Sequence, residues 1–179
     1  MLYAFGFKRL GIVAADLYFL DPSPGPGQEG PERGVRLELR FLEQPEREGS
    51  IYASRAIEVG RPVWRVDLLE SVDNPGSLDR AHHHPKMSGW EPGSRQFEPE
   101  LSADPIAWVA KRLENVEELL HASGVEDSEI DAQDVEQLRA SSGEILEAIR
   151  RLLERISDGE LGRPPELAHD ATLIRSGWL

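Results

Sequence analysis

Apolar and polar residues alternate along the first part of the chain, which is the pattern of half-buried β-strands. Every second residue of the segment 35–42 is apolar, namely Val35, Leu37, Leu39 and Phe41. Similar alternation runs through residues 2–20 and 62–72, and we expect the last of these to form a hairpin with residues 51–59 across Gly60-Arg61. Sequential strands with short connections predict an antiparallel sheet with one face covered.

Beyond residue 104 the apolar positions recur every three or four residues, which indicates amphipathic helices. Asp104-Pro105 is typical of an N-cap followed by proline at the first helical position, and the apolar stripe behind it continues to Leu120. A second stripe begins near Asp131, with a break expected at Ser142-Gly143. Two such stripes fit an antiparallel helix pair or the seam of a homodimer, and the pattern does not choose between them.

The predicted fold class is therefore α+β: an antiparallel sheet of about four strands packed by a long helix, with a helical C-terminal extension. We expect residues 1–124 to form the α+β domain and residues 125–179 to form the helical extension and a tail. Within the first unit, the Pro/Gly-rich segment 21–34 predicts an unpacked loop. Turn signals on both sides of the histidines predict a second loop over 79–95.

The composition narrows the function classes. The chain has 179 residues, a net charge of −13 and no cysteine, which excludes disulfides, thiol catalysis and cysteine-ligated metals. Nine acids and no basic residue lie between Leu113 and Leu138, so broad binding to nucleic acid or membrane is not expected. This acidic surface fits a solvated helix face or a basic protein partner. The apolar run 10–15 is shorter than a signal-peptide core or a membrane span, so we expect a cytoplasmic protein.

Three adjacent histidines are the best candidates for chemistry. Pro85 favours extended backbone before it, so His82 and His84 are expected on one side and His83 on the other. Two imidazoles on one side can accept and donate protons, as RNA cleavage by the internal 2′-hydroxyl requires. In this interpretation Asp67 orients a histidine, and the remaining candidates hold phosphate or stack a base, namely Arg65, Arg80, Lys86, Trp90 and Arg95.

The same histidines fit two other interpretations. His82 and His84 have the His-x-His spacing of a metal-ligand pair, which Asp67, Asp79 or Glu91 would complete. Alternatively, the histidines hold a polar turn by hydrogen bonds to backbone carbonyls. No P-loop, dinucleotide-binding or HExxH motif occurs, so no cofactor is expected.

A set of short motifs carries a resemblance to a known family. The order Trp64-Arg65-Val66-Asp67, His82-His83-His84-Pro85, Phe97 and Asp104-Pro105 before an amphipathic helix resembles the TumE-type toxins of bacterial toxin–antitoxin systems. The resemblance covers about residues 35–120. It implies an antiparallel sheet with an Arg-x-Asp step, a histidine-rich loop and action on RNA. This chain departs from it in the acidic helical extension, the Pro/Gly insertion and the negative charge.

Three hypotheses about function follow. The first is a toxin-like ribonuclease that uses His82 and His84 for acid–base cleavage of RNA. The second is a non-enzymatic interaction or oligomerising protein, which binds a basic partner or a second copy through its C-terminal helices. The third is a metal-dependent hydrolase. Whether the chain is an enzyme is left open by the sequence.

Overall fold

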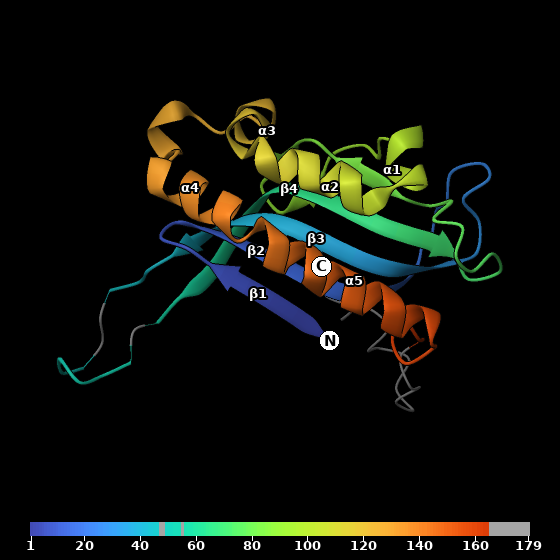
Figure 1. The fold of residues 1–179 in the computed structure, drawn as a ribbon, viewed down its shortest axis with the longest axis horizontal. Helices are drawn as coiled ribbons and strands as arrows, with labels where there is room; N and C mark the ends of the chain where they lie inside the picture. Colours follow the sequence, from blue (N-terminus) through green and yellow to red (C-terminus); the bar gives the residue numbers. More distant parts are fainter. Residues whose placement is uncertain (47–48, 55, 165–179) are drawn as a thin grey trace.

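A computed structural model of the chain describes residues 1–46, 49–54 and 56–164. Five strands form one antiparallel sheet in the order β1-β2-β3-β4-β5 (Figure 1). Their bounds are Leu2–Gly6 (β1), Leu10–Leu20 (β2), Pro31–Glu43 (β3), Glu58–Ser71 (β4) and His82–His84 (β5). A separate two-stranded hairpin pairs β6 (Met87–Ser88) with β7 (Glu91–Pro92). The α+β class and the antiparallel sheet are confirmed, with five strands rather than about four.

The strand β4 runs without interruption through Gly60 and Arg61, so the hairpin expected there is wrong. Instead β4 pairs with β3 along its whole length, with register shifts between Leu39 and Leu42. Pro62 lies opposite Arg40 at this irregularity, where a residue without an N–H group is tolerated because the ladder is already interrupted. Gly60 is thus part of a bulged strand and not a turn.

The helices follow the sheet in the chain. Their bounds are Pro99–Ala103 (α1), Pro105–Glu114 (α2), Val116–Ala122 (α3), Ala132–Ala140 (α4) and Ser142–Ser157 (α5), with a short 3-10 helix at Asp127–Glu129. The side chain of Asp104 accepts a hydrogen bond from Ala107 N at 2.9 Å, which confirms the N-cap. None of the helices in the described ranges is long and apolar enough to span a bilayer.

The single long helix expected over residues 105–120 is wrong, because α2 ends at Glu114 with Asn115 as its C-cap, and α3 begins at Val116. The Asn115 side chain donates to the carbonyl of Lys111 at 2.8 Å, and its backbone leaves the helical region with φ −107° and ψ 39°. Asparagine competes in this way with the helical hydrogen bonds. The apolar stripe continues across the break into α3, so the periodicity alone did not show it.

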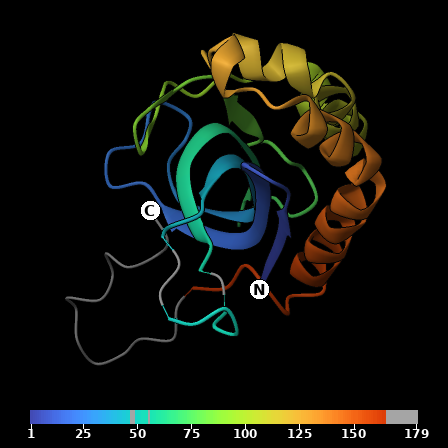
Figure 2. The ribbon, with the colours of Figure 1, turned by 90° about the vertical axis from the view of Figure 1, so that its left-hand side faces the viewer.

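The helices cover one face of the sheet. Seen end-on, the sheet is strongly curled and the helices lie along its outer side (Figure 2). Leu37 and Leu39 of β3 and Val66 of β4 are buried in the same core as Ile149 and Leu152 of α5. Residues 142–157 therefore share the core of the sheet. The alternate positions of the same strands face the other way, and we call that surface the inner face.

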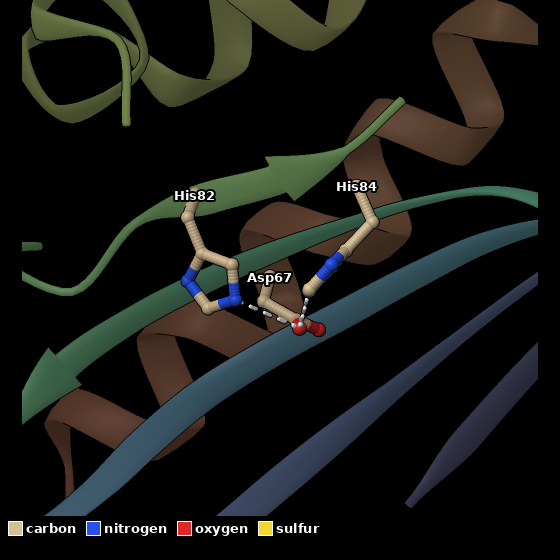
Figure 3. A group of neighbouring side chains, drawn as sticks. All are labelled: Asp67, His82 and His84. Atoms are coloured by element: carbon tan, nitrogen blue, oxygen red, sulfur yellow. Dashed lines mark ion pairs between the residues drawn. The ribbon is translucent and has the colours of Figure 1, made fainter. Parts of the chain in front are cut away.

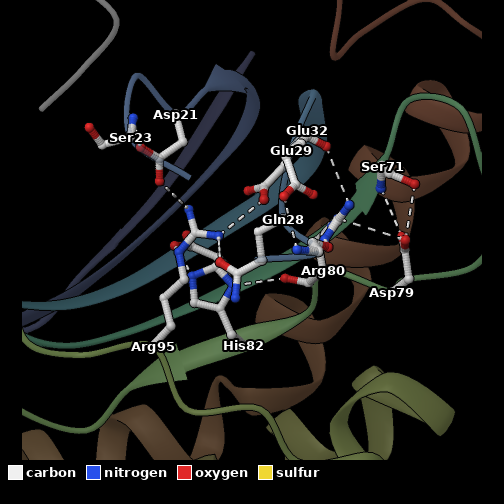
Figure 4. A network of polar contacts seen from close by, with 12 residues as sticks. Asp21, Ser23, Gln28, Glu29, Glu32, Ser71, Asp79, Arg80, His82 and Arg95 are labelled. Atoms are coloured by element: carbon white, nitrogen blue, oxygen red, sulfur yellow. Dashed lines mark hydrogen bonds and ion pairs between the residues drawn. The ribbon is translucent and has the colours of Figure 1, made fainter. Parts of the chain in front are cut away.

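The Pro/Gly-rich segment forms a loop over residues 21–30 in which no residue is buried, and two arginines hold it by hydrogen bonds. Arg95 donates to the side chain of Gln28 at 3.1 Å, and Arg80 donates to the carbonyl of Gly27 (Figure 4). The loop ends where β3 begins at Pro31. The tail that was expected after the helical extension lies outside the described residues from residue 165 onward.

Candidate functional site

The three histidines form the strand β5 rather than a loop, so the expected histidine-rich loop is wrong. Strand β5 pairs with β4 so that His82 lies opposite Asp67 and His84 lies opposite Arg65. Strand β4 in turn pairs with β3, which places Arg36 opposite Asp67. Directly opposed residues share a face of the sheet. The register therefore gathers these five side chains on the inner face.

Asp67, His82 and His84 converge at the centre of this group (Figure 3). The Nε2 atom of His82 lies 3.3 Å from Asp67 Oδ2, and the Nε2 atom of His84 lies 3.6 Å from the same oxygen. One possible ligand atom from each residue lies within 4.8 Å of the others. All three residues are buried, with 1% exposure for Asp67 and His82 and 3% for His84. We call these three residues the Asp–His–His cluster.

Backbone carbonyls fix the orientation of both imidazoles. The Nδ1 atom of His82 is 2.7 Å from Arg80 O, and the Nδ1 atom of His84 is 2.7 Å from Gly93 O. A carbonyl oxygen can only accept, so each Nδ1 carries a hydrogen and donates it. Gly93 is held in place by the β6–β7 hairpin, where its N–H donates to Lys86 O at 3.0 Å. Each ring consequently turns its Nε2 atom toward Asp67.

Two arginines surround the carboxylate. The Nε atom of Arg36 donates to Asp67 Oδ1 at 2.7 Å, and the Nε atom of Arg65 lies 3.1 Å from Oδ2. Burial alone raises the pKa of Asp67, but its polar neighbours, with Arg36 the strongest, outweigh it and hold the pKa well below its usual range. Asp67 is therefore a buried carboxylate at neutral pH.

The two histidines of the cluster differ in what their Nε2 atoms contact. The Nη2 atom of Arg65 is 2.9 Å from His84 Nε2. A guanidinium has only donors, so His84 accepts this bond and is a neutral imidazole. The Nε2 atom of His82 is buried, and it has no hydrogen-bond partner among the residues that the structure describes. A buried nitrogen without a partner is costly and needs an explanation.

Other residues predicted for the site lie at its margin or away from it. Arg80 and Arg95 hold the 21–30 loop, and Arg95 also donates to the buried Glu32 at 3.0 Å. Trp90 is 61% exposed. The guanidinium of Arg40 lies over the Trp90 ring, 5.0 Å from the ring centroid. Lys86 is exposed beside the β6–β7 hairpin.

Of the three acids considered as a third metal ligand, the structure brings only Asp67 to the histidines. Asp79 accepts hydrogen bonds from Ser71 and Ser77, and Glu91 is exposed on β7. Sequence reasoning missed Arg36, which binds Asp67 across the sheet. Arg36 is one of the charged residues of the strand predicted over 35–42. Its pairing with Asp67, however, can be seen only when the register of β3 on β4 is known.

His83 points to the opposite face, as expected from the alternation. Its Nε2 atom contacts Glu98 Oε1 at 2.9 Å, and the other oxygen of Glu98 accepts from Trp108 Nε1 at 2.8 Å. Trp108 is buried and stacks on Trp64 with ring centroids 6.1 Å apart. His83 therefore joins the sheet to the helices and lies apart from the cluster.

Comparison with known proteins assigns no family and no function to this chain. No model of a known protein family, no curated protein and no solved structure matches this chain.

Proposed function

We propose that this protein binds a divalent transition-metal ion at the Asp–His–His cluster and acts as a metal-dependent hydrolase. The observation that carries the proposal is the convergence of two imidazole Nε2 atoms on one carboxylate oxygen, at 3.3 and 3.6 Å. Two histidines and one carboxylate are a ligand set for zinc and for other first-row metals. A metal ion at their centre would also use the lone pair that His82 leaves without a partner.

The surroundings of the cluster support a metal ion. Metal-bound histidines commonly donate their other ring nitrogen to a carbonyl or carboxylate, which fixes the tautomer and the ring orientation. His82 and His84 both do this, through Arg80 O and Gly93 O. The lone pair of His84 Nε2, which faces the Arg65 guanidinium, and the carboxylate oxygen of Asp67 converge on the same point. The arrangement thus favours a positive charge at this point.

Hydrolysis follows from the number of protein ligands. Asp67, His82 and His84 would hold the ion by three ligands, and the ion would supply the Lewis acidity that activates water for hydrolysis. The protein's own part is to hold the two imidazoles and Asp67 in place and to exclude bulk solvent. Arg65 on the same face is suited to an anionic group on the substrate.

Acid–base cleavage of RNA by His82 and His84 is supported less well by the same geometry. The Asp67 carboxylate lies between the two imidazoles, where the phosphate of the substrate would have to lie, and like charges repel. The toxin-like ribonuclease stays a prediction. Equal growth of cells that express the wild type and the double variant His82→Ala/His84→Ala would contradict it.

Metal binding can be tested directly by calorimetry on untagged protein that has been treated with a chelator. We expect Zn²⁺ and Co²⁺ to bind at one ion per chain, and His82→Ala and His84→Ala each to lower the affinity by at least a hundredfold, because each removes one ligand. His121→Ala is the matched control, since His121 is exposed and contacts Asp127 at 2.8 Å. No binding by the wild type, or an equal loss in the His121 variant, would contradict the proposal.

A further inference from the structure

We infer that the guanidinium of Arg65 occupies the cation position of the cluster in the metal-free chain, and that a metal ion displaces it to become part of an oxyanion site beside the metal. This inference rests on the proposed metal centre. It concerns how the centre is regulated and what class of ligand it takes: inorganic phosphate or a phosphate ester.

Arg65 contacts two of the three ligand groups through the atoms that a metal ion would use. Its Nη2 atom is 2.9 Å from His84 Nε2, and its Nε atom is 3.1 Å from Asp67 Oδ2. The Nε2 atom of a neutral imidazole has one lone pair, so it cannot accept from Arg65 and bind a metal ion at the same time. Arg65 and the metal ion are therefore mutually exclusive at His84.

Arg36 is the contrasting case. Its shorter hydrogen bond runs from Nε to Asp67 Oδ1 at 2.7 Å, and its Nη2 atom reaches Oδ2, which the two histidines approach, only at 3.4 Å. Its hydrogen bonds run to Asp67, and none of those described involves His82 or His84. Arg36 can therefore stay in place and orient the carboxylate when a metal ion binds to Oδ2. Of these two arginines, Arg65 is the one that has to move.

A second acid is available to the displaced guanidinium on the same face. Glu38 of β3 lies directly opposite Arg65 in the register, and it already pairs with Arg40. Arg65 is itself largely buried, with a side chain that is 13% exposed. A shift toward Glu38 keeps the charge on the inner face, close to the metal position.

The charge balance of the inner face then calls for an anion. In the part of the sheet that the structure describes, its charged residues are three arginines and three carboxylates: Arg36, Arg40 and Arg65 with Glu32, Glu38 and Asp67. Arg95 and Asp21 add one charge of each sign beside Glu32, so the charges balance while the histidines are neutral. A divalent ion adds two positive charges in a buried place, which is costly unless an anion accompanies it. The planar fork of Arg65 suits a phosphate oxygen pair.

The experiment compares metal affinity in the wild type, Arg65→Gln and Arg36→Gln by calorimetry with Co²⁺. Both substitutions remove a cation beside Asp67, but only Arg65→Gln also removes the donor on His84. We expect Arg65→Gln to bind Co²⁺ at least tenfold more tightly than Arg36→Gln does. Arg65→Lys, which keeps the charge and loses the fork, provides a second measurement if the Gln variant fails to fold, and we expect it too to bind more tightly than the wild type.

A second arm uses inorganic phosphate and the visible absorption of the Co²⁺-loaded protein. We expect phosphate to change the spectrum of the loaded wild type, and to bind at least tenfold more weakly to loaded Arg65→Gln. The single substitution would thus strengthen metal binding and weaken anion binding, which a purely structural role would not produce.

The outcomes separate the inference from the function on which it rests. Equal Co²⁺ affinity in the wild type and Arg65→Gln, or equal tightening in Arg36→Gln, would overturn the displacement of Arg65 and leave the metal centre standing. Phosphate binding that is the same with and without metal would overturn the oxyanion site. No Co²⁺ binding by any variant, the wild type included, would overturn the proposed function and this inference together.

Discussion

His83 differs from its two neighbours because its side chain points to the helices and not to the inner face. It contacts Glu98, and the ring of Trp108 lies 5.1 Å from its own. Burial lowers the pKa of His83, and the nearby Glu98 only partly opposes this effect. The folded protein therefore prefers the neutral imidazole at this position.

The depressed pKa of His83 predicts a specific loss of stability in weak acid. The unfolded chain takes up a proton near pH 6.5, and the folded chain takes it up only at lower pH. The free energy of unfolding should fall as the pH drops from about 6.5 to the folded pKa, by at most about 1.4 kcal/mol per pH unit. Urea unfolding of His83→Gln should show a flatter profile between pH 7 and 5.

Glu98, the hydrogen-bond partner of His83, provides an internal control, because it titrates in a different pH range. The pKa of Glu98 is lowered by its hydrogen bond from Trp108 and by His83 and Arg112, which outweigh the effect of burial. Its contribution to stability is lost only below about pH 4.5, so it should remain visible in the His83 variant. Identical profiles for wild type and variant between pH 7 and 5 would contradict the role of His83.

At the residue scale, alternation was enough to predict which side chains share a face. It placed His82 and His84 together, and it placed Arg65 beside Asp67, which the 3.1 Å contact confirms. It was not enough to find Arg36, because Arg36 meets Asp67 only through the pairing of β3 with β4. Contacts between strands depend on register, and register is a property of the folded sheet.

At the element scale, the pairing of β3 with β4 depends on one glycine. Gly34 has φ +153°, and a Cβ atom at this position would lie 2.0 Å from the carbonyl oxygen of Leu68. The two backbones approach too closely here for any side chain. The glycine thus allows β4 to follow β3 along the curled sheet and to present Asp67 and Arg65 to β5.

Substitution of this glycine should be far more costly than substitution of a glycine in a helix. Gly34→Ala forces the two strands apart, and we expect it to lower the free energy of unfolding by about 3 kcal/mol or more. Gly143→Ala in α5 is the matched control, because nothing lies within 4 Å of the added Cβ atom and alanine favours a helix by about 0.5–1 kcal/mol. Urea unfolding of both variants tests this, and a Gly34→Ala variant as stable as the wild type would refute it.

The elements were predicted well where the hydrophobic pattern was long and regular. The strand over 35–42 and the N-cap at Asp104 are confirmed. Two of the errors fall at single residues that change the backbone without changing the pattern. Asn115 ends a helix within a continuous stripe, and the bulge at Pro62 lets a strand continue through Gly60.

At the scale of the whole molecule, a buried carboxylate joins the helices to the far edge of the sheet. Asp134 of α4 is fully buried, and its Oδ1 atom accepts from the backbone N–H groups of Lys8 and Arg9 at 2.7 and 3.2 Å. These residues form the turn between β1 and β2. The sequence suggested only an acidic helix surface here, and nothing in it separated Asp134 from the exposed acids around it.

Removal of this carboxylate should destabilise the whole fold. Asp134→Ala leaves two backbone donors without their acceptor, and we expect a loss of about 2–4 kcal/mol in the free energy of unfolding. Lys8→Ala is the control, because it removes the exposed ion pair with Asp131 and keeps both backbone donors, so its effect should be much smaller than that of Asp134→Ala. Chemical denaturation would contradict this assignment if the two variants lost equal stability.

The apolar stripe of α5 packs against the sheet of the same chain. Ile145, Ile149 and Leu152 of α5 are buried in the core with the sheet. One of the two interpretations of this stripe was the seam of a homodimer. In the structure the sheet of the same chain covers the stripe that a second copy would have had to cover. Binding of a basic partner to the acidic surface stays a prediction.

Burial of the Asp–His–His cluster also affects how fast an ion can enter and leave it. Its three residues are at most 3% exposed, and two of them lie on a strand of only three residues at the edge of the sheet. At the proposed metal site, exchange of an ion would require a local opening of this edge strand, which is slower than diffusion to an open site. The ion found in the cluster would accordingly reflect which metal was available while the sheet was closing, as much as which metal binds most tightly.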